Sequence, residues 1–131
     1  MSALVEIRDL VIAYDGGGGT TRGLDSAELS VANGETLAIV GESGSGKTTI
    51  GMSIGRLLPP EARIESGTIT VDGVSVVDAD AEALRQLRRD RLGFVFQNPM
   101  TALDPTMRIE RQMIRAIGGK PSRDAIAVLL R

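Results

Sequence analysis

A glycine-rich loop lies between an apolar segment and a helical pattern in residues 36–52, TLAIVGESGSGKTTIGM. Residues 41–48 read GESGSGKT, which satisfies every fixed position of the P-loop pattern G-x-x-x-x-G-K-[ST]. Glycines let the backbone bend so that successive N–H groups point inward, where side chains would collide with a phosphate. The pattern therefore predicts a phosphate-binding loop, with an ordinary glycine-rich turn as the alternative.

The residue types of this loop suit a magnesium nucleotide. Lys47 would reach the β- and γ-phosphates as a mobile positive charge, and the Thr48 hydroxyl would ligate Mg²⁺. A helix that starts near Lys47 would add its dipole to the anion site. The residues predicted to bind ATP in this loop are Gly41, Glu42, Ser43, Gly44, Ser45, Gly46, Lys47, Thr48 and Thr49.

The flanks of the loop predict a strand before it and a helix after it. Residues 37–40 form a continuous apolar run, which is typical of a central parallel strand covered on both faces. Apolar residues with helical spacing follow, and two prolines are expected to end that helix. These apolar residues are Ile50, Ile54, Leu57 and Leu58, and the prolines are Pro59 and Pro60.

Length and composition limit the class of protein. A chain of 131 residues with 42% hydrophobic and 24% charged residues is at most one globular domain. Its net charge of −2 shows no excess of positive charge that would attract nucleic acid, so we expect no nucleic-acid partner. No apolar run approaches the roughly 20 residues of a membrane span, and no signal peptide is recognisable, so we expect a cytoplasmic chain. The absence of histidine removes the commonest general base.

The N-terminal segments predict antiparallel strands. Residues 4–14 read as a first strand with a bulge near Arg8 and Asp9, and residues 16–19 as a hairpin loop. A half-buried strand is expected where Ala27, Leu29 and Val31 alternate with polar residues. The Asn33-Gly34 pair is expected to turn this strand into the one that precedes the phosphate loop.

Residues 67–77 predict an edge hairpin that turns at Asp72-Gly73, so we reject Asp72 as a magnesium-binding acid. Asp80 is expected to cap a helix that ends in a cluster of arginines on a solvated face, with a nucleic-acid patch as the alternative. The cluster consists of Arg85, Arg88, Arg89 and Arg91. A short strand over residues 92–96, a helix over about 107–117 and a last helix capped by Ser122 complete the expectation.

In this order, the segments resemble the nucleotide-binding subunits of ABC transporters. The resemblance rests on Tyr14 at the end of the first strand, the Asn-Gly-Glu turn at residues 33–35, GESGSGKTT, the SGTITVDG hairpin and FVFQ ending at Gln97. It implies an α/β P-loop NTPase fold of the ABC type, with an antiparallel β part, a P-loop core and the start of a helical subdomain. The phrase FQNPMTALDPTMR is similar to ATP-binding subunits of oligopeptide, dipeptide and nickel importers. Glu110-Arg111 departs from the glycine and acid common there, which affects only the local helix.

The resemblance also implies roles for residues and partners. Tyr14 would stack on adenine, and Gln97 would contact Mg²⁺ or the attacking water, so that Thr48 and Gln97 form the metal set. Residues 97–113 would contact transmembrane permease subunits, and a second nucleotide-binding subunit would complete a dimer. The chain would then lie at the inner face of the cell membrane. Residues 1–97 would form the ATP-binding core, and residues 98–131 the Q-loop and the beginning of the helical subdomain.

The resemblance covers the first half of the family's domain. Its signature motif, its Walker B strand with the magnesium-binding Asp and catalytic Glu, and its switch histidine would follow Arg131. The missing strand would pack beside residues 36–40. Lys47 and Gln97 would contribute to catalysis without completing it, so we expect this chain to bind ATP without turnover.

Other classes of protein stay open at this stage. A small-molecule kinase or another P-loop NTPase would share GESGSGKT but would leave Tyr14 and FQNPMTALDP unexplained. A non-catalytic interaction module or a remnant would not depend on Lys47. An ABC protein of DNA repair would fit the P-loop but not the importer-like segment or the absence of a basic excess.

Overall fold

The computed structural model describes residues 3–117 of the chain. It divides into two compact units, the first reaching Arg85 and the second beginning at Gln86, and each is described by itself. The first unit contains a four-stranded sheet and the helix that follows the phosphate loop.

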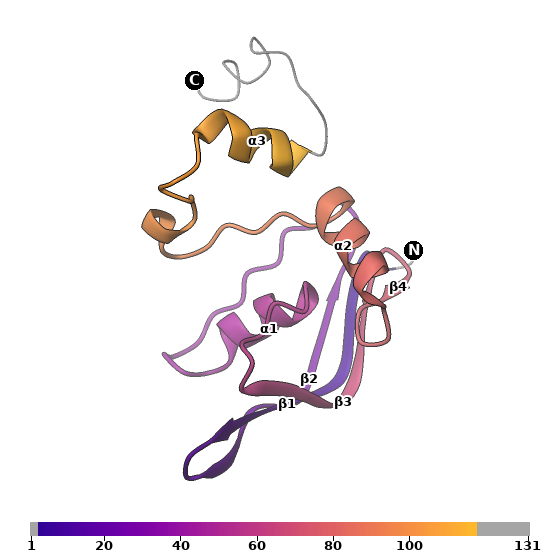
Figure 1. The fold of residues 1–131 in the computed structure, drawn as a ribbon. Helices are drawn as coiled ribbons and strands as arrows, with labels where there is room; N and C mark the ends of the chain where they lie inside the picture. Colours follow the sequence, from indigo (N-terminus) through magenta and orange to yellow (C-terminus); the bar gives the residue numbers. More distant parts are fainter. Residues whose placement is uncertain (1–2, 118–131) are drawn as a thin grey trace. The chain divides into compact units, whose positions relative to one another are not determined.

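The sheet is antiparallel, with strand order β2-β1-β3-β4 (Figure 1). Its strands are β1 (Val5–Gly16), β2 (Gly19–Val31), β3 (Ala62–Val71) and β4 (Val74–Ser75). The predicted hairpins are confirmed, with turns at residues 17–18 and at Asp72-Gly73, although β3 begins at Ala62 rather than Gly67. Alternating apolar residues of β1 and β3 form the buried core, which includes Ile7, Leu10, Ile12, Ile69 and Val71.

The predicted bulge in β1 is confirmed. Pairing of β1 with β2 shifts between Ile7 and Leu10, and Asp9 has a positive φ of 48°. A residue added to one strand bends that strand and increases its twist. The bulge therefore lies in the centre of the sheet, since β1 is flanked by β2 and β3.

Helix α1 (Lys47–Ile54) starts where the sequence predicts and packs against β2 and β3. It ends four residues before Leu58, so the predicted length was too great. The chain leaves the helix through Gly55 and Arg56, whose φ of 50° lies in the left-handed region. Glycine and a left-handed residue commonly end helices, and they do so here ahead of the two prolines.

Two predicted strands are wrong. The apolar segment at residues 36–40 and the segment at residues 92–96 have no regular secondary structure and belong to no strand among residues 3–117. Val40 is 89% exposed and Val95 is fully exposed. An apolar run becomes a strand only when a neighbour completes its hydrogen-bond ladder. No segment in the described part of the chain pairs with either one.

Up to residue 117, three short helices follow the sheet in sequence: α2 (Ala81–Asp90), the 3-10 helix η1 (Pro99–Thr101) and α3 (Ile109–Ile117). The predicted cap of α2 is confirmed, because the Ala83 amide donates to Asp80 Oδ1 over 2.8 Å. The predicted solvated arginines Arg85 and Arg89 pair with acidic neighbours within α2. The last helix, predicted from Ser122, lies outside the described residues.

Candidate phosphate-binding site

The loop of residues 41–46 ends in a glycine that starts helix α1. Gly46 is the N-cap of this helix and has a φ of +89°, in the left-handed region that favours glycine. No side chain in the described part of the chain caps α1, and its first turn contains no acidic residue. The exposed N–H groups of the first turn therefore face no local carboxylate that would compete with an anion.

The curvature of the loop leaves no room for side chains at two of its glycines. A Cβ at Gly41 would lie 2.7 Å from Ser45 Oγ. A Cβ at Gly46 would lie 2.6 Å from Leu24 Cδ2 and 3.1 Å from the Gly23 carbonyl oxygen of β2. The loop is thus a backbone cradle held against β2, which suits a phosphate group that approaches backbone amides closely.

Lys47 carries the positive charge of the cradle. Its ammonium donates to the Gly41 carbonyl over 2.8 Å, to the Glu42 carbonyl, and to Ser45 Oγ over 3.1 Å. These acceptors are all neutral groups of the loop itself. An anion in the cradle would therefore find a cation already positioned, and among residues 3–117 it would have no ion pair of Lys47 to break.

The other predicted loop residues are open to solvent. Glu42, Ser43, Gly44 and Thr48 are exposed, while Thr49 is half-buried on the next position of α1. Among the described residues, no group of three or more histidine, cysteine, aspartate or glutamate side chains could hold a metal ion. A magnesium site would therefore combine the Thr48 hydroxyl with oxygens from a nucleotide, which matches the preference of Mg²⁺ for oxygen ligands.

Tyr14 lies next to the first turn of α1. Its hydroxyl shares a hydrogen bond of 2.9 Å with the Thr49 hydroxyl, although the two residues are 35 positions apart. One edge of its ring lies over Gly23 in β2, where a Cβ would come within 2.4 Å of Tyr14 Cε2. The structure thus brings together Tyr14 and the phosphate loop, both of which the sequence had singled out.

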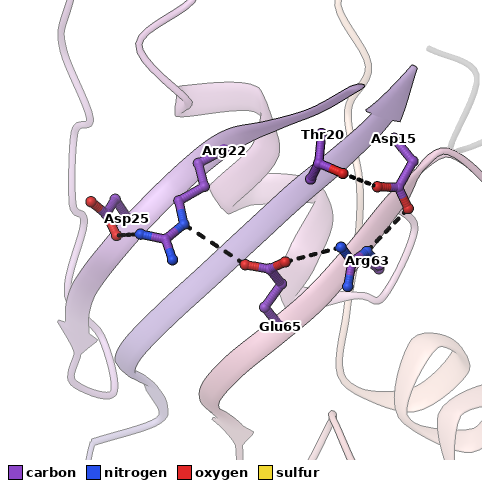
Figure 2. Close-up of polar contacts among 6 residues, drawn as sticks. All are labelled: Asp15, Thr20, Arg22, Asp25, Arg63 and Glu65. Atoms are coloured by element: carbon purple, nitrogen blue, oxygen red, sulfur yellow. Dashed lines mark hydrogen bonds and ion pairs between the residues drawn. The ribbon is translucent and has the colours of Figure 1, made fainter. Parts of the chain in front are cut away.

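A polar network joins three strands at Asp15, the residue that follows Tyr14 in β1 (Figure 2). Arg63 of β3 donates to Asp15 over 3.0 Å and pairs with Glu65 over 3.1 Å, and Arg22 of β2 lies 3.8 Å from Glu65. Ala13, which is in register with both arginines, has no exposed surface. The network therefore joins β1, β2 and β3 beside Tyr14.

The network predicts a small loss of stability in acid. The Thr20 hydroxyl and then the Arg63 guanidinium lower the pKa of the Asp15 carboxyl. A lowered pKa contributes stability above the ordinary value of about 3.9, which is lost as pH falls through the folded-state value. We expect Asp15→Asn to reduce the dependence of unfolding free energy on pH below about 4, measured by urea titration at pH 7, 4 and 3. Parallel curves for the variant and the wild type would contradict this assignment.

Gln97 belongs to the second unit, where its side chain is exposed. Its predicted role with Thr48 at magnesium stays a prediction. In the same unit, Gln112 of α3 holds the turn before the helix. Its amide donates to the Asp104 carbonyl over 2.8 Å and to the Met107 carbonyl over 2.7 Å, and it accepts from the Asp104 amide over 2.9 Å.

Gly23 and Leu24 are site residues that sequence reasoning missed. Both contact the phosphate loop at Gly46, and Gly23 also supports Tyr14. The available signal was a glycine inside a strand, which often marks close approach of another group. That signal indicates a contact but not its partner, because the partners lie far away in the sequence.

Together, the antiparallel sheet, the glycine cradle and the helix behind it define an ABC-type P-loop nucleotide-binding fold. A comparison with protein families matches residues 24–131 to the family described as ABC transporter. The chain therefore belongs to the ABC transporter family.

Proteins similar to this chain are named as transport ATP-binding proteins. The chain is 40% identical to the peptidoglycan transport ATP-binding protein YejF of Agrobacterium fabrum, over 97% of this chain and 24% of that protein. It is 35% identical to the oligopeptide transport ATP-binding protein OppD of Bacillus subtilis, over 89% of this chain and 33% of that protein. The chain thus spans a quarter to a third of the length of these relatives.

Among solved structures, the chain is similar to a dimeric ATP-binding cassette in a post-hydrolysis state, bound to ADP and Pi. The TM-score is 0.75 at 30% identity, over 92% of this chain and 51% of that one. None of the helices described among residues 3–117 has the length and apolar character needed to cross a membrane.

Proposed function

We propose that this chain is the MgATP-binding part of an ABC importer for peptides or similar small solutes. The observation that carries the proposal is the position of the Lys47 ammonium, which lies on neutral acceptors in the mouth of a glycine cradle. The names of the relatives, which are transport ATP-binding proteins for peptidoglycan, oligopeptides and dipeptides, support the class of solute.

The chain's own residues would bind the nucleotide in two places. The backbone of the loop, Lys47 and the first turn of α1 would hold the phosphates. Tyr14 would offer its ring to adenine, because aromatic faces stack on bases. Thr48, with Gln97, would ligate Mg²⁺, which neutralises phosphate charge when it is bound.

The second unit would contact permease subunits through residues 97–113. Large apolar side chains are exposed there, including those of Met100, Leu103 and Ile109. Six residues between positions 106 and 114 line an open cavity of about 610 Å³, and Gln112 holds the adjoining turn. A fixed surface with exposed apolar groups suits a protein partner. A second nucleotide-binding subunit would complete a dimer at the cytoplasmic face of the membrane.

We expect the 131-residue chain to bind ATP without measurable turnover. Its sequence contains no histidine, and no apolar run ends in Asp-Glu, so we expect no carboxylate placed to activate water for attack on the γ-phosphate. Lys47 would neutralise phosphate charge and Gln97 would contact Mg²⁺ or the water, which contributes to catalysis without completing it.

Calorimetry with MgATP, with phosphate release followed in the same samples, tests this function. The expected result is saturable micromolar binding without phosphate release. Absence of binding in a chain that shows a cooperative unfolding transition would favour an interaction module instead. Steady hydrolysis would show that a catalytic acid lies within these 131 residues.

A further inference from the structure

The Tyr14 ring is held from two directions, by Gly23 of β2 and by Thr49 of α1. Its hydroxyl is tied to Thr49 on α1 over 2.9 Å. Its edge rests on the backbone of Gly23, because a Cβ there would lie 2.4 Å from Cε2 and 2.8 Å from Cδ2. The ring therefore occupies space that is open only because residue 23 is glycine.

The same part of β2, residues 23 and 24, also contacts the phosphate loop. A Cβ at Gly46 would meet Leu24 Cδ2 at 2.6 Å and the Gly23 carbonyl oxygen at 3.1 Å. Leu24 is 7% exposed, so this support is part of the packed interior. Tyr14 and Gly46 therefore both lie against residues 23–24 of β2. The hydrogen bond from Tyr14 to Thr49 of α1 is a second link between the ring and the helix that begins after Gly46.

We propose that Gly23 and Thr49 are positioning residues that fix the Tyr14 ring at a set place relative to the phosphate loop. The inference rests on the proposed function, in which the ring receives a purine base while the loop receives the phosphates. A ring fixed in advance need not be ordered when the ligand binds, so less free energy is lost on binding. Gly23 should therefore matter for a ligand with a base and not for a bare polyphosphate.

A bulkier residue at position 23 should displace the ring rather than unfold the sheet. The atoms that a Cβ would meet first belong to the Tyr14 side chain, which can rotate away, and the nearest backbone atom is 3.7 Å distant. Rotation would separate the two hydroxyls and release the ring into solvent. A change in ring position at nearly constant stability distinguishes a positioning role from a general structural one.

Tyr14 can be observed directly, because it is the chain's single tyrosine and the chain has no tryptophan. We would measure acrylamide quenching of tyrosine emission in the free chain, and binding of MgATP and of magnesium tripolyphosphate by calorimetry. The variant is Gly23→Ala. The matched control is Gly17→Ala, which makes the same change in the β1–β2 hairpin. An added Cβ at Gly17 would meet no described atom within 4 Å apart from its chain neighbours.

For Gly23→Ala we expect about a twofold rise in the quenching constant. MgATP should bind about tenfold more weakly, because base stacking contributes on the order of tenfold or more to affinity. Tripolyphosphate should bind within about twofold of the wild type. Gly17→Ala should match the wild type in all three measurements.

The hydrogen bond between the Tyr14 and Thr49 hydroxyls is tested in the free chain with two variants of Thr49. Thr49→Val removes the hydroxyl at nearly constant shape, and we expect quenching to rise as in Gly23→Ala. Thr49→Ser keeps a hydroxyl and should restore quenching to near the wild-type value. Equal quenching in the valine and serine variants would show that the hydrogen bond does not hold the ring.

Other results would overturn the proposal in distinct ways. Unchanged quenching and unchanged MgATP affinity in Gly23→Ala would remove the positioning role. Equal losses of MgATP and tripolyphosphate affinity would mean that Gly23 acts through the phosphate loop alone. If the wild-type chain bound no MgATP, the proposed function would fail, while the quenching comparison would still decide whether Gly23 and Thr49 hold the ring.

Discussion

Replacing Lys47 with alanine is expected to weaken binding of MgATP by the 131-residue chain at least about 100-fold. The Lys47 ammonium is the positive charge in the mouth of the loop, and it rests on two carbonyls and a hydroxyl. Hydrogen bonds to charged groups contribute about 1.5–3 kcal/mol each, and a loss of about 2.7 kcal/mol is a factor of 100 in affinity. Calorimetry with MgATP measures the change.

A matched control is available in the chain's other lysine. Lys120→Ala makes the same change in charge and side-chain size outside the loop. It should bind MgATP within about twofold of the wild type. If both variants lost affinity equally, net charge rather than the cradle would be responsible. If neither lost affinity, the loop would not be the nucleotide site.

Lys47→Ala should also leave the sheet intact. The Lys47 ammonium donates its hydrogen bonds to groups of the loop, whereas the core is made of β-strand residues such as Ile12 and Ile69. Far-ultraviolet circular dichroism and the urea midpoint should therefore differ little from those of the wild type. This separates loss of binding from loss of folding.

Features set by a few adjacent residues were predictable from the sequence. The Asp72-Gly73 turn and the Asp80 cap depend on local backbone preference and on a side chain that reaches three residues along the chain. The glycine loop follows from the same kind of local rule. In each case the interacting groups are neighbours in sequence, so the pattern itself contains both partners.

Features that depend on distant partners were not predictable. The apolar run at residues 36–40 has the composition of a buried strand, yet Val40 is exposed because no described segment pairs with it. The Tyr14–Thr49 hydrogen bond spans 35 residues. A single sequence shows that residues such as Gly23 are unusual in a strand, but it does not show which side chain uses the space.

Gly67 provides the largest expected change in stability. It lies in β3 with a φ of +94°, directly against the bulge of β1. A Cβ there would lie 2.5 Å from the Asp9 carbonyl oxygen, 2.6 Å from Leu10 Cα and 2.7 Å from the Arg8 carbonyl oxygen. All three are backbone atoms in the centre of the sheet, so they cannot move aside as a side-chain end could.

We expect Gly67→Ala to lower the free energy of unfolding by about 3–5 kcal/mol, because left-handed strain and a backbone collision add together. Gly73→Ala is the matched control, since Gly73 also has a positive φ, of 79°. An added Cβ there would meet no described atom within 4 Å apart from its chain neighbours. This variant should cost only the strain, about 1–2 kcal/mol. Urea titrations of both variants give the difference.

The comparison decides whether the bulge is rigid. A domain is stable by about 5–15 kcal/mol, so Gly67→Ala should lower the urea midpoint severely or abolish the transition, while Gly73→Ala keeps a cooperative one. If the two midpoints were equal, backbone conformation alone would set the cost, and the bulge at Arg8-Asp9 would yield to a Cβ. The bulge and Tyr14 belong to the same strand, β1. If the backbone at the bulge moved to accommodate a Cβ, the backbone of β1 alone would not be rigid enough to fix the position of Tyr14.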